Sequence, residues 1–207
     1  MELAELLRRR RMTRAFEPRP VEPEVLDGVL DAVRRAPSAG NAQGYHFVVL
    51  EGPETARFWN VTLPADRRQS FRWLQLLDAP VIVLPFADRS AYTRRYGEPD
   101  KASTGLSDAD AWPVPYWTVD TSFATMLLLL AAQDAGLGAL FFGVFRHADE
   151  LVARLGVPDD MELIGAIALG YPVPGEPGEP GRSANRPKRS FDDVVHRGGW
   201  NGAPARR

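Results

Sequence analysis

The chain has 207 residues, of which 44% are hydrophobic and 25% are charged, a composition typical of one globular α/β or α+β domain. Its formal net charge of −2 offers no overall basic field for nucleic acid, and the lack of cysteine excludes disulfides, cysteine-ligated zinc and thiol catalysis. The most apolar run, 126–132, is too short for a membrane span of about 20 residues, and no signal-peptide pattern stands near the first residue. We therefore expect a cytoplasmic protein with no membrane or nucleic-acid partner, and the scarcity of lysine beside arginine favours a bacterial, GC-rich source.

The first half of the chain is predicted to alternate helices with short strands. Apolar spacing predicts helices at 1–11, at 23–36 and at 66–78, and Pro37 ends the second of them. The runs 46–51 and 80–86 are rich in β-forming residues, and we expect both to be buried strands.

The second half contains the strongest helix and the least regular segment. Residues 88–117 show no clean period and hold five aromatic residues among glycine, proline and charges; irregular segments of this length are usually functional or mobile. Residues 120–135 form a helix that is apolar nearly all round, so it must be buried in a core or at a subunit interface. Strands are predicted at 139–145 and 162–172 with a helix at 149–155 between them, followed by a proline- and glycine-rich spacer at 174–181. We expect a single α+β domain over residues 1–207.

Arginine dominates the stretch RRRRMTR, Arg8 to Arg14. For Arg8 and Arg9, a solvated helix end is an equally good interpretation. Arg10 follows two leucines of the first helix by three and four positions, so on a helix it shares their apolar face, and Arg14 comes four residues later. An arginine directed at the interior requires an anion, and phosphate matches its planar fork.

A loop of small and amide-bearing residues, PSAGNAQG, joins the second helix to the first strand. Ordinary turn chemistry is one explanation, because serine, glycine and asparagine are favoured in turns. A flat polar ligand is the other. The amides of Asn41 and Gln43 both donate and accept, so they can match a ring edge that alternates carbonyl and N–H groups, and the small neighbours let a ring approach the backbone.

Several familiar patterns do not fit. The glycines of GLGALFFG, 136–143, follow a helix and open a strand, which is the reverse of a dinucleotide-binding turn. The three histidines lack metal-ligand spacing, and no nucleophile elbow is present. The aromatic segment 88–117 is either a satellite core or a lid that stacks on a planar substrate.

Three blocks, taken in order, resemble the FMN-dependent nitroreductase family. They are RRRMTRAFEPRPVEPEVLDGVLDAVRRAPSAGNAQGYHFVVLE, then VDTSFATMLLLLAAQDAGLGALFFGVF, then IGAIALGYP with KRSFDDVVHRGGW. The resemblance covers nearly the whole chain. It implies a nitroreductase-like fold, with a central, mostly antiparallel sheet flanked by helices, in a domain-swapped homodimer built on a long central helix.

The resemblance also implies a site for FMN at the subunit boundary. The cofactor-binding residues it implies are Arg10, Arg11, Met12, Arg14, Ser38, Asn41, Gln43, Phe142, Gly143, Lys188 and Arg189. The N-terminal arginines would bind the phosphate and ribityl chain, the loop would hold the isoalloxazine ring, and the backbone at 142–143 would face N5. The tail, 174–207, would cross to the partner subunit. Met12 stands where the family usually has Ser or Thr, so one hydrogen bond would come from Thr13 or the backbone.

The implied activity is ping-pong hydride transfer from NADH or NADPH through flavin N5 to a planar acceptor such as a nitroaromatic, quinone or enone. The cofactor carries this chemistry, so no catalytic side chain is expected. The lid would supply the substrate-binding residues Tyr96, Trp112, Tyr116 and Trp117. Alternatives are a dehalogenase-like or flavin-fragmenting relative, a flavin carrier with little turnover, and an interaction module that uses the helix at 120–135.

Overall fold

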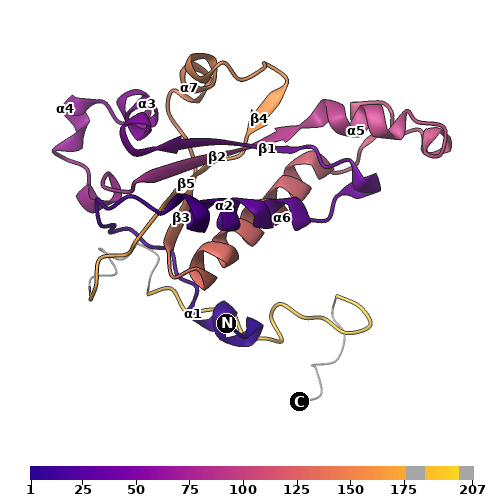
Figure 1. Cartoon of the computed structure of the whole chain (residues 1–207). Coiled ribbons are helices and arrows are strands. Elements are labelled where there is room, and N and C mark those ends of the chain that lie inside the picture. Colours follow the sequence, from indigo (N-terminus) through magenta and orange to yellow (C-terminus); the bar gives the residue numbers. More distant parts are fainter. Residues whose placement is uncertain (176–184, 201–207) are drawn as a thin grey trace.

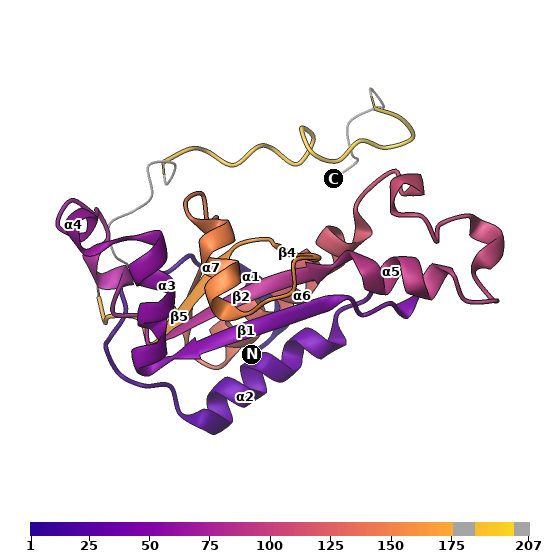
Figure 2. The ribbon, with the colours of Figure 1, turned by 90° about the horizontal axis from the view of Figure 1, so that it is seen from above.

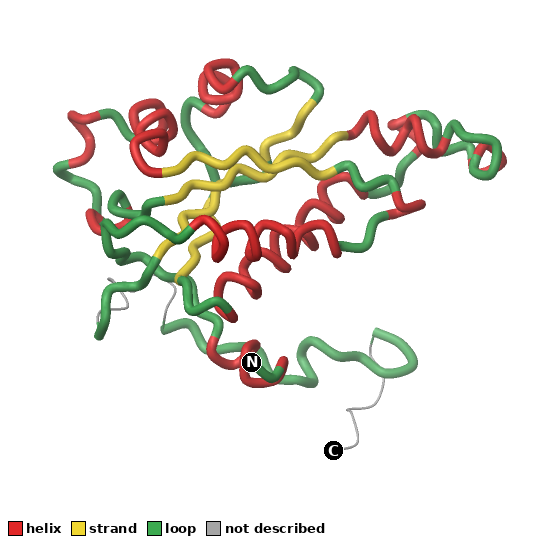
Figure 3. The backbone as a smooth tube through the Cα atoms, viewed as in Figure 1, coloured by secondary structure: helices red, strands yellow, loops and turns green. Residues whose placement is uncertain are grey.

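A computed structural model describes residues 1–175 and 185–200 of the chain. Its helices are α1 (Leu3–Arg9), α2 (Pro23–Asp31), α3 (Thr55–Thr62), α4 (Ala65–Arg68), α5 (Arg89–Tyr96), α6 (Tyr116–Asp134) and α7 (Ala148–Leu155). Its strands are β1 (Tyr45–Glu51), β2 (Val81–Asp88), β3 (Gly138–Phe142), β4 (Met161–Leu163) and β5 (Ala166–Gly170). Short 3-10 turns and loops connect them (Figure 3).

The strands of the described chain form one sheet in which every pairing is antiparallel. The order is β1-β2-β5-β3, and β4 pairs with the far end of β2. Helices α2 and α6 lie against one face of this sheet, and α3 and α7 lie on the other (Figure 1). The predicted α+β class with a mostly antiparallel, helix-flanked sheet is confirmed.

The core is divided by the sheet into two layers. Along β2, Val81 and Val83 join the cluster beneath α2 and α6, whereas Ile82 and Leu84 join the cluster beneath α3 and α7. Successive side chains of a strand point to opposite faces, so a strand between two helix layers is buried throughout. All eight residues of β2 are indeed buried.

Periodicity located the second helix, the long helix, the helix near residue 150 and the central strands, but some predictions were wrong. The apolar run 46–51 forms β1, yet β1 is an edge strand in which only Leu50 is buried. The predicted strand 162–172 is broken into β4 and β5 between residues 163 and 166. Gly165, with φ of 157°, lies at the break, and an added Cβ there would stand 2.6 Å from the Phe141 ring.

The predicted helix at 66–78 was also wrong, and two helices were missed. Only the single turns α4 and Leu74–Leu76 are helical there, because Phe71 and Trp73 pack their rings into an aromatic cluster instead of following one helix face. Helix α3 was missed because its buried side chains, Phe58, Trp59 and Val61, stand within about one helical turn, which is too short a run to show a period. Helix α5 was missed because charged residues surround its one buried side chain, Tyr92.

None of the helices in the described ranges combines the length and apolar character needed to cross a bilayer. The predicted spacer 174–181 lies mostly outside the described residues.

Candidate functional site

The N-terminal arginines are carried to one edge of the sheet. Helix α1 ends at Arg9, and the chain then runs beside β3, where Met12 bridges to Ala139 and the Thr13 amide donates to the Ala139 carbonyl at 2.9 Å. The next residue inward, Arg14, donates from Nη1 to the Met12 carbonyl at 3.2 Å and lies over the Trp73 ring, 5.7 Å from its centroid. The pairing with β3 therefore aims Arg14 at the C-terminal end of that strand.

A cavity of about 380 Å³ opens at this place. Arg14, Phe142 and Gly143 all line it, so the structure brings together three residues that the resemblance assigned to one site. Two further walls come from α3 and the segment after it, in the form of Trp59 and Trp73. The Phe142 ring stacks on Trp59 with an interplanar angle of 7° and a centroid distance of 6.1 Å. We call this hollow the aromatic cavity.

The aromatic walls were missed in the sequence. The density of aromatic residues over 58–73 is a signal that could have found them, but only Phe71 was interpreted from the sequence, as part of a helix face. Flat apolar walls with cations at the rim suit a planar ligand that carries negative charge, because rings bury large areas and guanidinium groups pair with anions.

Arg10 has a nitrogen whose environment is unusual. Its Nη1 is buried and has no hydrogen-bond partner in the part of the chain that the structure describes. A buried donor without an acceptor is costly, so this atom fits a site completed by an anion such as phosphate. Arg11 is exposed, and the partly buried Met12 side chain packs against both core clusters.

The loop of residues 38–44, which we call the amide loop, is tightly folded on itself. Ser38 Oγ accepts a hydrogen bond from the backbone N–H of Gln43 at 2.9 Å, and the side-chain Nε2 of Gln43 donates to Asn41 Oδ1 at 3.2 Å. Gly40, Asn41 and Gln43 have φ of 59°, 57° and 51°. Such left-handed values cost non-glycine residues about 1–2 kcal/mol each, although asparagine tolerates them better than most. Strain of this kind is typical of functional loops, and both amides are exposed.

The amide loop and the aromatic cavity lie at opposite ends of the protomer. The loop contacts α5, through a hydrogen bond from Arg95 Nε to the Gly40 carbonyl, while the cavity is lined by α3 residues such as Phe58. Helices α5 and α3 stand at the two ends of the sheet in both views (Figures 1 and 2). One protomer alone therefore does not bring the arginines and the amides together.

The predicted substrate-binding aromatics gather beside the amide loop and pack on one another. Trp112 contacts the rings of Tyr96, Tyr116 and Trp117 at centroid distances of 4.7, 5.7 and 6.2 Å, and its Nε1 donates to the Leu106 carbonyl at 2.8 Å. Trp117 is buried, whereas Tyr116 is 40% exposed. These contacts favour the satellite-core interpretation for Trp112 and Trp117 and leave Tyr116 free to meet a ligand.

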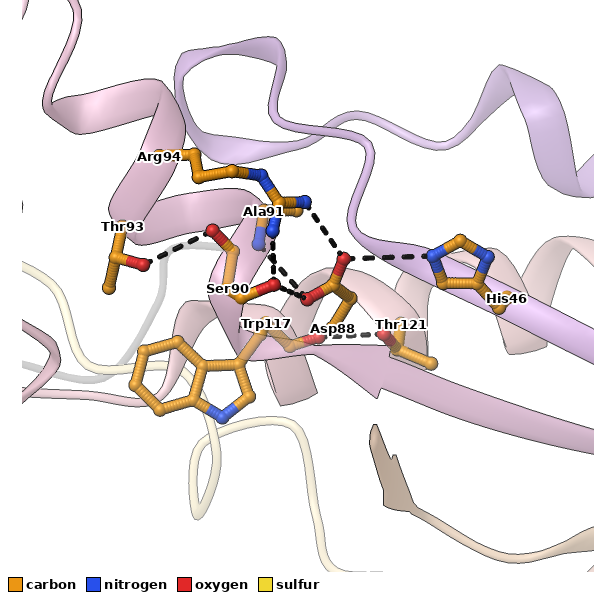
Figure 4. A network of polar contacts seen from close by, with 8 residues as sticks. All are labelled: His46, Asp88, Ser90, Ala91, Thr93, Arg94, Trp117 and Thr121. Carbon is orange, nitrogen blue, oxygen red and sulfur yellow. Dashed lines mark hydrogen bonds and ion pairs between the residues drawn. The ribbon is translucent and has the colours of Figure 1, made fainter. Parts of the chain in front are cut away.

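A polar network anchors the start of α5 (Figure 4). The buried Asp88 carboxylate accepts from Ser90 Oγ at 2.7 Å and from the Ala91 amide at 3.0 Å, with Arg94 Nη2 at 3.3 Å and His46 Nε2 at 3.8 Å. Burial alone raises the pKa of Asp88, but the two hydrogen bonds and the guanidinium outweigh it, so the net shift of the pKa is downward. Asp88 is thus the N-cap of α5, a role that was not predicted from the sequence.

The tail residues Lys188 and Arg189 are exposed, and Arg189 donates to the carbonyl of Asp193 in the same tail segment. Among the described residues, neither Lys188 nor Arg189 lines the aromatic cavity of its own protomer. The described residues also hold no cluster of three or more metal-ligating side chains.

The fold and the site define an α+β protein with a cationic, aromatic cavity at one sheet edge. The model of the Nitroreductase family matches residues 7–171, and the chain belongs to this family.

Three proteins illustrate how the chain relates to known ones. A protein of Archaeoglobus fulgidus, provisionally named NADH dehydrogenase/NAD(P)H nitroreductase, is 27% identical over 175 residues, 83% of this chain and 86% of that protein. Iodotyrosine deiodinase 1 of Rattus norvegicus is 27% identical over 194 residues, 84% of this chain and 63% of that protein. A solved structure from Exiguobacterium sibiricum, provisionally named a nitroreductase and in complex with FMN, has a TM-score of 0.70 at 17% identity, covering 94% of this chain and 96% of that one, which shows the shared fold.

Proposed function

We propose that this protein is a cytoplasmic, FMN-dependent oxidoreductase that uses NADH or NADPH to reduce a planar electron acceptor. The observation that carries the proposal is that Arg14, Phe142 and Gly143 line one cavity of about 380 Å³. When bound, FMN supplies a redox centre that takes electrons from a reduced nicotinamide and passes them to a second substrate. Membership of the Nitroreductase family and the relative named for NAD(P)H support the same activity.

The residues of the cavity, together with Arg10, suit this cofactor. The unpartnered, buried Arg10 Nη1 is a donor that a phosphate oxygen would satisfy, and Arg14 adds a second guanidinium at the cavity itself. Hydrogen bonds between guanidinium and phosphate belong to the stronger, charge-assisted class. The walls of Trp59, Trp73 and Phe142 exclude water from the flat faces of a ring, and the backbone of Gly143 offers polar atoms at its edge.

The working unit in this proposal is a homodimer. The amide loop of one protomer is far from its own aromatic cavity, so the amides would have to meet the ring from the partner. Helix α6 exposes Phe123 by 48% and Met126 by 41%, and α1 exposes Leu3 and Leu7 by 63% and 52%. Exposed apolar side chains on neighbouring helices indicate a surface that a second copy covers.

The tail would complete the same interface. In its described part, Phe191 is 60% exposed and Trp200 is 81% exposed. If the tail crosses to the partner, these two side chains would be buried, and Lys188 and Arg189 would reach the phosphate. In this arrangement residues 1–207 form one domain, in which residues 88–117 contact the acceptor and 174–207 wrap the partner.

A second candidate within the same fold is reductive dehalogenation. The similarity to iodotyrosine deiodinase 1 over 84% of this chain supports a halogenated phenol as an acceptor class. The two candidates share the cofactor and differ only in the acceptor.

The test is an anaerobic titration of the purified protein loaded with FMN. We expect the protein to retain FMN. Addition of NADH or NADPH should then remove the visible absorbance of the flavin, and a nitroaromatic, quinone, enone or halogenated phenol acceptor should restore it. Restoration only by the halogenated phenol, with halide release, would favour the second candidate. Retained colour that neither nicotinamide removes would indicate a flavin carrier, and failure to take up FMN would end the flavin proposal.

A further inference from the structure

The amide loop is held from outside by the arm, which we define as residues 89–117, from α5 to the start of α6. An added Cβ on Gly40 would lie 2.9 Å from Tyr96 Cε2, and one on Gly44 would lie 2.6 Å from Tyr92 Cε2. The rings of Tyr92 and Tyr96 therefore press directly on the backbone at two points of the loop. Because these tyrosines are four residues apart on α5, a single helix face covers both points.

Asp120 of α6 is the first polar anchor of the loop. It is only 3% exposed, and its Oδ2 accepts from the Ala39 amide at 2.8 Å and from the Tyr92 hydroxyl at 2.7 Å. Burial and the neighbouring carboxylate both raise the pKa of Tyr92, so its hydroxyl remains a donor. A buried carboxylate is tolerated only when it is hydrogen-bonded, and here its partners are the loop and the arm.

Arg95 of α5 is the second anchor. Its Nε donates to the Gly40 carbonyl at 2.8 Å, while Nη1 and Nη2 each donate to one carboxylate oxygen of Asp100 at 2.7 Å. Nη1 also donates to Glu98 at 3.0 Å, and the side chain is 22% exposed. The guanidinium thus connects the loop to the first turn after α5 with a planar, bidentate geometry that lysine cannot reproduce.

We propose that the arm is a brace that holds the amide loop in its left-handed conformation, with Asp120 and Arg95 as positioning residues. The step from loop to cofactor rests on the proposed function, in which the loop holds the flavin ring. Glycine adopts positive φ freely, but positive φ at Asn41 and Gln43 persists only when the surroundings enforce it. Without the brace the loop relaxes and the two amides lose their common direction, so the arm acts on cofactor retention as well as on the acceptor.

The test compares Arg95→Leu with Arg89→Leu, a matched change at the exposed first residue of the same helix. Hydrogen exchange of peptides over residues 38–44, in purified protein with excess FMN, reports the loop itself. We expect exchange there to rise roughly 10-fold and FMN to dissociate roughly 10-fold more readily in Arg95→Leu, with a changed visible circular dichroism of the flavin, and no change in Arg89→Leu. Arg95→Lys keeps one donor for Gly40 but lacks the fork, so it restores part of both losses.

Asp100→Asn is a second variant for the case that Arg95→Leu does not fold. Asp100 is 60% exposed, and its change weakens only the bidentate contact with the Arg95 guanidinium. In Asp100→Asn, we expect hydrogen exchange over residues 38–44 and FMN dissociation both to rise, by a smaller factor than in Arg95→Leu. Unchanged exchange over 38–44 in both variants would overturn the brace. Faster exchange with unchanged FMN affinity would overturn the link from brace to cofactor. Failure of the unaltered protein to bind FMN would count against the proposed function alone, because the exchange result still decides the brace.

Discussion

The two ends of the protomer differ in how completely their polar groups are satisfied. Arg14, which lines the aromatic cavity, contacts the Trp73 ring and the Met12 carbonyl, and Arg10, four residues before it, keeps a buried nitrogen without a partner in the described chain. At the amide loop, by contrast, backbone groups from Ala39 to Gly44 are engaged by Asp120, Arg95 and the Asp88 amide. One end requires a charged ligand to be complete, and the other is already organised to present two amides.

This difference supports the proposal that the site is divided between two copies of the chain. A preorganised loop loses little entropy on binding, so it is suited to meet a ligand held elsewhere. The cavity supplies cations and flat walls but has few polar groups for a ring edge. Each end offers what the other lacks, and in the proposed homodimer a second protomer brings them together.

The largest effect is expected from breaking the contact between copies. Phe123→Asp places a charge on the exposed apolar face of α6. Burying an unpaired charge in an interface costs about 3 kcal/mol, so we expect the dimer to dissociate roughly 100-fold more readily and to lose FMN with it. Analytical ultracentrifugation over a dilution series measures the first effect, and flavin fluorescence the second.

Ala153→Asp is the control for that change, because Ala153 is exposed on α7, across the sheet from α6. It should leave both readouts unaltered. A Phe123→Asp protein that stays dimeric and retains its cofactor would place the contact between copies elsewhere.

An intermediate effect is expected at the cavity end. Arg14→Ala removes a guanidinium that lines the cavity, whereas Arg8→Ala removes one that is exposed in the last turn of α1. A charge-assisted hydrogen bond contributes about 1.5–3 kcal/mol, so FMN should bind roughly 10- to 100-fold more weakly to the first variant and unchanged to the second. Fluorescence titration with FMN measures both, and equal losses would contradict the inward placement of Arg14.

The smallest effect is expected at the N-cap of α5. Asp88→Asn keeps an acceptor for the cap but removes the charge that pairs with Arg94, and it should lower the free energy of unfolding by about 1 kcal/mol at neutral pH. Because the pKa of Asp88 is lower in the folded than in the unfolded protein, its contribution is fully present above about pH 4, the usual aspartate range, and is lost as pH falls through the folded value.

Urea unfolding at several pH values measures this difference, with Asp27→Asn on the exposed side of α2 as the control. The stability gap between the unaltered protein and Asp88→Asn should narrow in acid. A gap that is constant from neutral to acid pH would show that the charge of Asp88 contributes nothing to the cap.

Local pattern determined a large part of this protein. The stripe of α2, the all-round apolar character of α6 and the β-rich runs of β2 and β3 follow from which residues must avoid water, a property of sequence alone. The small residues and amides of the loop likewise indicate an unusual backbone by their composition, and the positive φ of Asn41 and Gln43 agrees with that indication.

Only the tertiary structure decided how these pieces meet. Nothing in the spacing of residues 58–73 distinguishes rings on one helix from rings that converge on a cavity, because that depends on contacts across the sheet. Asp120 looks like an ordinary polar position in a helix, yet packing places its carboxylate under the Ala39 amide, 81 residues away. Long-range contacts set burial and direction, and for that reason the separation of the amide loop from the arginines became visible only in the folded chain.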